Sequence, residues 1–416
     1  MAYDYVCKHE ARMNGLSASD PPLGSRPMSL AYRVRNLADC HNIADFRELA
    51  QRRLPFPVFH YIDGAADDEV TKRRNTAAFN DVDLVPDVLA GVETVDPSVT
   101  VLGRSTRLPL MLSPTALQRL FHWQGERAVA AAAEKFGLWF GISSLASVSI
   151  AEIGANYAGP KMLQYYYHKD KGLNAALLEA ARAAKFDAVA LTVDTIVGGN
   201  RERCLRTGFT SPPRITAASA LSYATRPRWA LDYMLREKFS LPNLEAHLPA
   251  GSNVSTSVQS YFSQFLDQSL DWKAAEKLRA DWGGKFVLKG VMSVGDARRA
   301  ADMGCDAIMV SNHGGRQLDG SRAPFDQLAE IVDAVGDRIE VILDGGVRRG
   351  THVLKALSLG AKAVSGGRLY LYALAAAGQP GVERALGLMR AEIERAMKLM
   401  GCRSVAELSR DNLAFR

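Results

Sequence analysis

Residues 341–368 read VILDGGVRRGTHVLKALSLGAKAVSGGR, and this stretch contains two of the short apolar runs that decide the fold. The runs are VILDGG (341–346) and AVSGGR (363–368), and each begins with aliphatic residues and ends with polar residues and glycines. A short continuous apolar run is typical of a strand that is buried on both faces of a parallel sheet. The stretch therefore predicts two neighbouring strands whose polar ends lie at one edge.

Six similar runs precede this pair. They are LPLMLSPT (108–115), LWFGISS (138–144), KMLQYYY (161–167), AVALTVD (188–194), FVLKGV (286–291) and AIMVSN (307–312). Helical segments such as GERAVAAAAEKFG and ALLEAARAAKF separate most of them, an alternation that indicates βαβ units. Eight such strands are the number that closes a (β/α)8 TIM barrel, so an α/β barrel is the predicted fold.

The chain is predicted to have three consecutive parts, the last of which contains a long insertion. Residues 1–30 are polar and broken by prolines, which is typical of a mobile N-terminal arm. Residues 31–100 form an N-terminal helical segment packed on the barrel, and residues 101–416 form the barrel itself. Residues 209–270 are a long insertion after strand four, of the kind that forms a lid or a membrane-facing element.

The first predicted helix covers residues 42–53, NIADFRELAQRR. Asn42 is a suitable N-cap, and a single face carries the apolar residues Ile43, Phe46, Leu49 and Ala50. Pro55 and Pro57 are expected to end this helix, because a residue that precedes proline is driven out of the helical conformation.

Composition excludes several classes of protein. The chain has 416 residues, of which 47% are hydrophobic and 23% charged, which are ordinary globular values. No run of eighteen apolar residues predicts a transmembrane helix, and the N-terminus lacks the apolar core of a secretory signal. Five scattered cysteines favour a reducing, cytoplasmic compartment and no metal site. The net charge of +6 suits anionic ligands or an anionic membrane surface, and no basic run indicates nucleic-acid binding.

The insertion contains a basic, amphipathic stretch, ATRPRWALDYMLREKF (224–239). Its four basic side chains are mixed with tryptophan, leucine, methionine and phenylalanine. Such a stretch lies in a membrane interface or is an ordinary helix that covers the barrel, and the residues leave both interpretations open.

Polar side chains at the strand ends predict a phosphate site and a catalytic site on one rim of the barrel. After strands seven and eight, glycines would let backbone N–H groups approach a phosphate, with Arg348 or Arg368 adding charge. Asp344 is suited to accept hydrogen bonds from sugar hydroxyls.

After strand six, SNHGGRQLD (311–319) offers His313 as a base and Arg316 as a carboxylate ligand. Asp194 is a natural partner for the imidazolium form of His313. Arg201 is either a second carboxylate ligand or a solvated loop arginine. Lys289 has three open roles, which are a Schiff base, a phosphate ligand or a counter-charge for a cofactor ring.

Taken together, the motifs SPTALQ, LTVDT, LKG, SNHGGRQLD and LDGGVRRG resemble the FMN-dependent α-hydroxy acid dehydrogenase/oxidase family. The resemblance covers about residues 42–413 and places the motifs in order along the eight strands. It implies an FMN cofactor and the oxidation of an L-2-hydroxy acid, lactate-like or larger, to the 2-oxo acid.

The resemblance also implies a role for each matching residue. His313 would take the substrate proton, Asp194 would stabilise the imidazolium, and Lys289 would stabilise the reduced flavin ring. The substrate ligands would be Tyr61, Tyr166, Arg201 and Arg316, with Tyr166 at the hydroxyl. The FMN contacts would come from Thr115, Ala116, Ser143, Gln164, Thr192, Lys289, Ser311, Asp344, Gly345, Gly346, Arg348, Gly367 and Arg368. Leu145 stands where short-chain members carry a bulky aromatic side chain.

The sequence contains no Cys-x-x-Cys-His haem motif, so the electron acceptor is inferred from the same resemblance. The insertion is similar to the membrane-facing segment of bacterial members, which favours a quinone-linked enzyme held on the inner face of the cell membrane through 224–239. The alternatives are a soluble oxidase that makes hydrogen peroxide from dioxygen, and an FMN enzyme that oxidises a peptide-derived or bulky hydroxy acid. A homotetramer is also expected from the resemblance.

Overall fold

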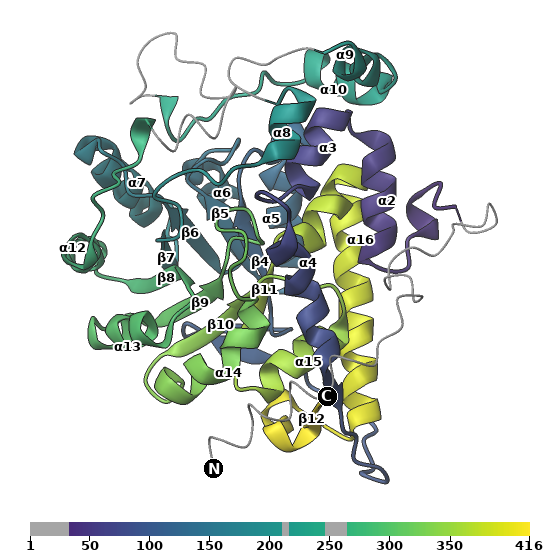
Figure 1. Cartoon of the computed structure of the whole chain (residues 1–416), viewed down its shortest axis with the longest axis vertical. Helices are drawn as coiled ribbons and strands as arrows, with labels where there is room; N and C mark the ends of the chain where they lie inside the picture. Colours follow the sequence, from purple (N-terminus) through teal and green to yellow (C-terminus); the bar gives the residue numbers. More distant parts are fainter. Residues whose placement is uncertain (1–32, 210–215, 246–263) are drawn as a thin grey trace, which may run out of the picture. The chain divides into compact units, whose positions relative to one another are not determined.

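The computed structural model describes residues 33–209, 216–245 and 264–416. Residues Asn36–Arg416 form one compact unit, and the fold below is that of this unit (Figure 1). The predicted mobile arm, residues 1–30, lies outside the described residues. Residues 210–215 and 246–263 of the predicted insertion also lie outside them.

Eight parallel strands close into a barrel in the spatial order β10-β11-β4-β5-β6-β7-β8-β9. Each predicted apolar run contains one strand, so the (β/α)8 prediction is confirmed. The strands are β4 (Leu110–Thr115), β5 (Trp139–Ser143), β6 (Lys161–Tyr165), β7 (Ala188–Thr192), β8 (Lys285–Val291), β9 (Ala307–Ser311), β10 (Glu340–Asp344) and β11 (Ala363–Gly366).

The outer helices follow the strands around the barrel (Figure 1). They are α5 (Glu126–Phe136), α6 (Ile150–Asn156), α7 (Lys171–Ala183), α12 (Trp272–Trp282), α13 (Val294–Asp302), α14 (Pro324–Val335), α15 (Gly350–Ser358) and α16 (Arg368–Met400). Helix α16 has a kink at Ala377 and Gly378, just before Pro380. Non-helical backbone and a helix-interior proline are the usual causes of such a kink.

Apolar side chains seal the N-terminal end of the barrel. A short hairpin of β2 (Val99–Val101) and β3 (Arg104–Thr106) brings Val101 and Leu102 against the barrel core. There they join Met111, Trp139, Met162 and Met309, all of which are buried. The polar strand ends named in the sequence lie at the opposite end of the barrel.

The N-terminal helices pack beside the barrel. They are η2 (Leu37–Asp39), α2 (Ile43–Arg53), α3 (Phe56–Asp63), α4 (Val70–Ala77) and η3 (Ala78–Asp81), and β1 (Val82–Leu84) pairs with β12 (Leu413–Phe415). Helix α2 packs against α16, and α3 packs against α8 (Glu202–Thr207).

The predicted first helix agrees with α2 at both ends. Asn42 is its N-cap and accepts from the N–H groups of Ala44 and Asp45, and the four predicted apolar residues are buried. The helix ends before the two prolines, as predicted, and Pro57 lies in the first turn of the next helix, α3. Proline fits there because the first helical N–H groups have no partner within the helix.

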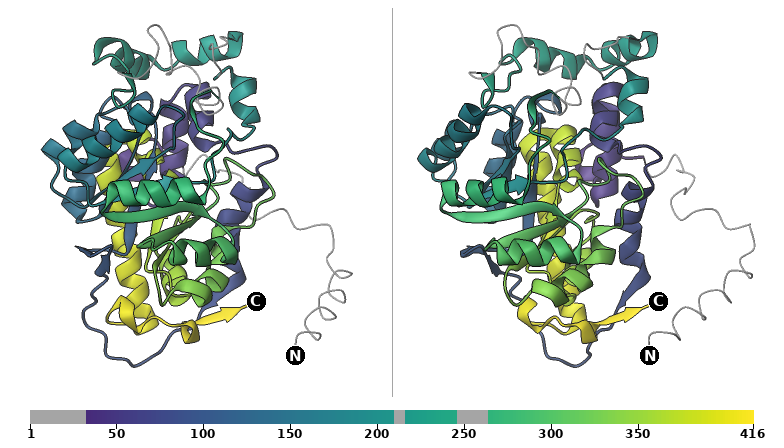
Figure 2. Two further views of the ribbon diagram at one scale, coloured as in Figure 1. Left: turned by 90° about the vertical axis from the view of Figure 1, so that its left-hand side faces the viewer. Right: turned by 60° about the vertical axis from the view of Figure 1, so that its left-hand side comes forward.

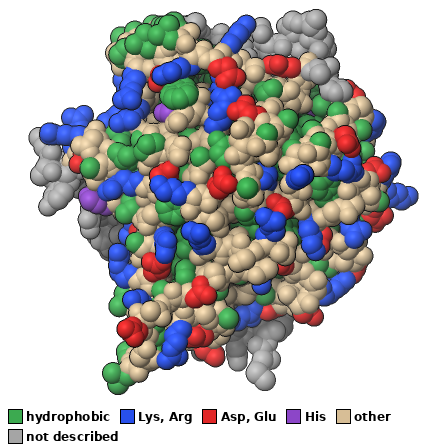
Figure 3. All heavy atoms as spheres, turned by 180° about the vertical axis from the view of Figure 1, so that it is seen from behind, with side chains coloured by type: hydrophobic (Ala, Val, Ile, Leu, Met, Phe, Trp, Pro, Cys, Tyr) green, Lys and Arg blue, Asp and Glu red, His purple; other side chains and the backbone are tan. Residues whose placement is uncertain are grey.

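The described part of the insertion carries two helices, α9 (Ala217–Ala224) and α10 (Pro227–Leu235), beyond the C-terminal ends of the strands (Figure 2). Several large apolar side chains on these helices point outward, with exposed fractions of 66% for Leu221, 69% for Met234 and 77% for Leu235. Figure 3 shows this apolar patch at the upper left, with basic side chains next to it. No helix in the described ranges combines the length and the apolar character needed to span a membrane.

Candidate active site

A cavity lies at the C-terminal ends of the barrel strands, with about 940 Å³ of space that is partly open to solvent. It brings together most of the residues that the sequence singled out. Those lining it are Tyr61, Thr115, Ala116, Ser143, Tyr166, Arg201, Lys289, His313, Arg316, Asp344, Gly345, Gly346, Arg348, Gly367 and Arg368. The other four stand behind this wall: Asp194 bonds to His313, Ser311 to Lys289, Gln164 to Ser143, and Thr192 to Gln164.

His313 and Asp194 form a close pair at the edge of this cavity. Nδ1 of His313 lies 3.2 Å and 3.3 Å from the two carboxylate oxygens of Asp194. Burial lowers the pKa of His313, and Asp194 partly opposes this shift. The imidazole is therefore neutral near pH 7 and able to accept a proton, while the carboxylate is placed to stabilise the charged form.

The local backbone allows this approach. Gly290, in the LKG motif, has a φ of +108°, and a Cβ added there would lie 2.7 Å from Cγ of Asp194. His313 itself has a φ of +58° and is followed by two glycines with positive φ. A non-glycine residue in the left-handed region is uncommon and is associated with functional sites.

Lys289 and Asp344 form a second, fully buried pair. Nζ of Lys289 lies 3.0 Å from Oδ2 of Asp344, and the hydroxyls of Ser113 and Ser311 donate to this carboxylate at 2.6 Å and 2.7 Å. Burial alone lowers the pKa of Lys289, but Asp344 and Asp194 hold it above its ordinary value. Lys289 is therefore a charged ammonium at the floor of the cavity.

Arg201 and Arg316 place two guanidinium groups in the same cavity. Nη1 of Arg316 donates to the backbone carbonyl oxygens of Tyr61 and Gly64 at 2.7 Å and 2.9 Å, and its guanidinium lies 4.9 Å from the Tyr61 ring centre. Burial and the neighbouring Arg316 lower the pKa of Arg201. Among the described residues, neither arginine has a carboxylate within ion-pair distance, so the pair is suited to an anionic ligand.

The loops after β10 and β11 provide the predicted phosphate side. Gly346 has a φ of +76°, and a Cβ there would lie 1.9 Å from the carbonyl oxygen of Asn75, so only glycine fits. Arg348 lines the cavity, and its guanidinium donates to the carbonyl oxygen of Val347 at 2.6 Å. Burial lowers the pKa of Arg348. A buried guanidinium beside glycine backbone is a suitable partner for a phosphate, and these residues fit FMN.

Arg368 has a different environment. Its guanidinium donates to the carbonyl oxygens of Ile62, Gly64 and Gly314 at 3.0, 2.6 and 2.8 Å, so each of its three nitrogens holds a backbone carbonyl. Burial lowers its pKa to about 10. Arg368 also lines the cavity and has two further N–H groups, and its predicted role at the cofactor stays a prediction.

Sequence reasoning missed a buried carboxylate that ties the N-terminal helices to the site. Asp63 at the end of α3 accepts from Arg47 at 2.6 and 2.9 Å, from Arg203 at 2.8 Å and from the Tyr372 hydroxyl at 2.7 Å. Burial alone raises the pKa of Asp63, but Arg47, Lys72 and Tyr372 hold it well below its ordinary value. This cluster fixes α3, which carries Tyr61.

The apolar wall of the cavity was also missed, except for Leu145. Phe121 and Leu371 line it together with Leu145, and the Tyr61 ring lies 6.1 Å from that of Phe121. Phe121 follows no strand and belongs to no motif, so the sequence carried no signal for it. Ser113 did have a signal, because it lies in the polar end of LPLMLSPT.

A barrel mouth with a histidine–aspartate pair, two arginines suited to a carboxylate and a glycine loop suited to a phosphate is the arrangement expected of a flavin-dependent oxidoreductase. The model of the family described as FMN-dependent dehydrogenase matches residues 50–415. The chain is 40% identical to an L-lactate dehydrogenase of Caulobacter vibrioides over 89% of its length and 97% of the relative. It is 39% identical to an L-lactate oxidase of Nostoc over 88% of its length and 96% of the relative.

Solved structures that are similar to this chain are also of 2-hydroxy acid enzymes. The monotopic membrane protein (S)-mandelate dehydrogenase has a TM-score of 0.85 and 34% identity, over 91% of this chain and 100% of that one. A mandelate oxidase has a TM-score of 0.80 and 36% identity, over 90% and 99%. The chain belongs to the FMN-dependent dehydrogenase family, as the sequence motifs predicted, and FMN is its cofactor.

Proposed function

We propose that this protein oxidises an L-2-hydroxy acid to the 2-oxo acid in the barrel-mouth cavity. The observation that carries this proposal is the neutral His313, paired with Asp194, in the same cavity as two arginines that have no carboxylate within ion-pair distance among the described residues. The bound FMN supplies the acceptor for the two electrons that leave the substrate. The remaining tasks belong to the protein, which must hold the acid, take a proton and exclude water.

The side chains suit these tasks. Arg316 and Arg201 bind the carboxylate, and Tyr61 packs beside them. Burial raises the pKa of Tyr166, so its hydroxyl keeps its proton and can hydrogen-bond the substrate hydroxyl. His313 accepts a proton at one ring nitrogen, and Asp194 stabilises the resulting imidazolium through Nδ1.

The apolar wall supports a substrate with an apolar side chain, lactate-like or larger. Phe121, Leu145 and Leu371 offer no hydrogen bond to a second polar group of the substrate. Curated relatives carry the names of L-lactate enzymes, and structural relatives carry those of mandelate enzymes. The proposal therefore extends from methyl to phenyl side chains.

Anaerobic bleaching of the yellow flavin tests this proposal. The purified protein is mixed with L-lactate, longer aliphatic 2-hydroxy acids, (S)-mandelate and the corresponding D-acids. We expect rapid bleaching by at least one L-acid and none by its D-form. A yellow protein that no member of the panel bleaches would remove the proposed activity.

We further propose that the electrons pass to a quinone at the membrane surface. The exposed apolar residues of α9 and α10 and the adjacent Arg226, Arg228 and Arg236 support contact with an anionic bilayer. Flotation with anionic vesicles tests this contact, with Met234→Glu/Leu235→Glu as the variant. The variant should stay with the soluble fraction; equal flotation of both proteins would contradict the proposal.

A second candidate acceptor is dioxygen, because the chain is as similar to an L-lactate oxidase as to an L-lactate dehydrogenase. Stopped-flow reoxidation of the reduced protein separates the two. A quinone-linked enzyme reoxidises faster with a short-chain quinone than in air-saturated buffer. Faster reoxidation in air, with stoichiometric hydrogen peroxide, would identify an oxidase.

A further inference from the structure

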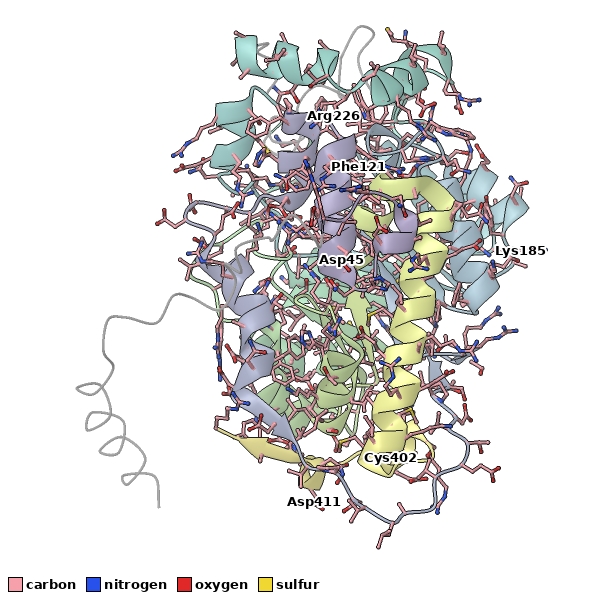
Figure 4. All side chains as sticks on the ribbon, turned by 90° about the vertical axis from the view of Figure 1, so that its right-hand side faces the viewer. Asp45, Phe121, Lys185, Arg226, Cys402 and Asp411 are labelled. Atoms are coloured by element: carbon pink, nitrogen blue, oxygen red, sulfur yellow. The ribbon has the colours of Figure 1, made fainter. Side chains whose placement is uncertain are left out.

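A second, larger cavity lies directly behind the first. It has about 1450 Å³ of space, part of it open to solvent, between the end of α2, the segment around Phe121, helix α10 and the kinked part of α16. Phe121 is in the lining of both cavities, so the two cavities meet at this side chain. Figure 4 shows Phe121 and Arg226 beneath the helices of the insertion.

This second cavity is strongly basic. It is lined by six arginines and by only two carboxylates, Asp232 and Glu237. Glu237 is shared between Arg119 and Arg127, at 3.3 Å and 2.8 Å. In the described part of the chain, Arg53 and Arg228 have no carboxylate within ion-pair distance, and burial and the neighbouring Arg228 lower the pKa of Arg53.

Two arginines that line this cavity each have a buried Nε without a hydrogen-bond partner among the described residues, Arg119 and Arg226. Arg119 is 6% exposed, and its terminal nitrogens are held by the carbonyl oxygens of Glu237 and Lys238. A buried donor without a partner costs free energy, and an acceptor oxygen brought close to it would remove that cost.

Aromatic rings line the same cavity. The Trp229 and Tyr233 rings are stacked, with centres 5.2 Å apart and planes 11° apart, and Nε1 of Trp229 is fixed by the carbonyl oxygen of Leu120. The Arg236 guanidinium lies 4.6 Å from the Trp123 ring centre. Flat rings combined with arginine donors recognise a planar ring that carries oxygen acceptors.

We propose that this cavity is the docking site for the electron acceptor, and that the acceptor is a quinone whose ring lies among Trp229, Trp123 and the arginines. This inference rests on the proposed function. The carbonyl oxygens of the quinone would accept from the arginine N–H groups, and its apolar tail would leave toward the exposed apolar residues of α9 and α10. Phe121, which lines both cavities, would lie between the ring and the catalytic cavity.

The overall exchange balances. One hydroxy acid and one quinone give one oxo acid and one quinol, with two electrons and two protons moved in all. The protons reach the quinone from water, because exposed residues such as Arg228 and Tyr233 line the cavity. Burial lowers the pKa of His122 to about 4, so His122 is neutral here and carries no stored proton.

The test compares Arg53→Gln/Arg228→Gln with the natural holoenzyme, using a short-tailed benzoquinone as the probe. Since neither arginine has a carboxylate within ion-pair distance in the described ranges, the change should leave no unpaired carboxylate there. Tryptophan fluorescence titration of the oxidised holoenzyme gives the quinone Kd, and steady-state assays give its KM. We expect both to rise by about tenfold or more, as for the loss of charge-assisted hydrogen bonds. Anaerobic bleaching by the hydroxy acid should be unchanged.

The matched control is Arg395→Gln, an exposed arginine on α16 outside both cavities. It should leave the quinone Kd and KM unchanged. An unchanged Kd and KM in Arg53→Gln/Arg228→Gln would overturn the docking site while leaving the proposed oxidation intact. Loss of anionic-vesicle binding with an unchanged quinone Kd would also overturn it, since the arginines would then serve lipid headgroups. Failure of every hydroxy acid to bleach the natural enzyme would count against the proposed function instead.

Discussion

The barrel-mouth cavity and the second cavity, which share Phe121 as a lining residue, are both lined by several cationic side chains. The partners of these cations differ between the two cavities. In the barrel mouth, Asp194 and Asp344 are held against His313 and Lys289. Around the second cavity, Arg52, Arg119 and Arg236 pair with the partly exposed carboxylates of Glu48, Glu237 and Asp232, whereas Arg53 and Arg228 have none within ion-pair distance among the described residues. Carboxylates placed against a base and an ammonium set protonation states, which chemistry requires. An arginine keeps its charge near pH 7, so Arg53 and Arg228 are suited to binding a ligand and not to moving a proton.

Removing a carboxylate from the first cavity gives the largest expected effect. Asp194→Asn keeps the shape of the side chain but removes the charge that stabilises the His313 imidazolium. We expect the anaerobic bleaching rate to fall by about 10²–10⁴-fold. The FMN content, measured from the yellow absorbance, serves as the control and should be unchanged. A rate within a few-fold of the natural enzyme would mean that Asp194 does not support the base.

The next largest effect is expected for Asp63, because its buried carboxylate links the N-terminal helices through hydrogen-bonded ion pairs. Asp63→Asn leaves Arg47, Arg203 and Lys72 without their shared carboxylate, so the free energy of unfolding should fall by about 3 kcal/mol. Because the pKa of Asp63 is lowered in the folded state, its contribution is present above the unfolded value near pH 4. It is lost as the pH falls below that value. Denaturant unfolding at pH 7 checks the loss, and an unchanged midpoint would contradict it.

The apolar wall gives a smaller effect that concerns substrate choice. Leu145→Phe fills space beside Phe121, so kcat/KM for (S)-mandelate should fall by about tenfold, while that for L-lactate is retained. Leu145→Met conserves volume and is the matched control. Equal losses for both acids would place Leu145 away from the substrate side chain.

The smallest effect is expected for stability in the second cavity. Arg53→Gln/Arg228→Gln removes two cations without acid partners, so the free energy of unfolding should change by no more than about 0.5 kcal/mol. Thermal unfolding of the holoenzyme measures this. A loss of several kcal/mol would show that these arginines hold the fold together, and the contrast between the two cavities would disappear.

The acid side of the pH profile of kcat/KM tests the protonation state of His313 in the first cavity. Burial lowers the pKa of His313 from its ordinary value of 6.5, so kcat/KM for the hydroxy acid should stay constant below pH 6.5 and fall only when the imidazole becomes protonated. Asp194→Asn should move this fall to still lower pH, because it removes a charge that raises the pKa. A fall centred above pH 6.5 in the natural enzyme would contradict a buried, neutral base.

The sequence predicted the barrel and the mouth because both are local in the chain. Each strand is a continuous apolar run, and His313, Asp344 and Lys289 lie directly at strand ends. Phe121 and the second cavity had no such signal, because that cavity is assembled from α2, the segment around residue 120, α10 and α16. The direction of the Arg368 side chain could not be predicted from the sequence either, because it depends on hydrogen bonds to the carbonyl oxygens of Ile62, Gly64 and Gly314.

The central claim is that His313 takes the substrate proton in a flavin-containing barrel mouth. Anaerobic stopped-flow reduction of the natural protein and of His313→Gln, both loaded with FMN, tests it most directly with the best L-2-hydroxy acid of the panel. We predict equal yellow absorbance of the two proteins before mixing, and bleaching that is about 10²–10⁴-fold slower in His313→Gln. Bleaching at the same rate in both proteins would contradict it.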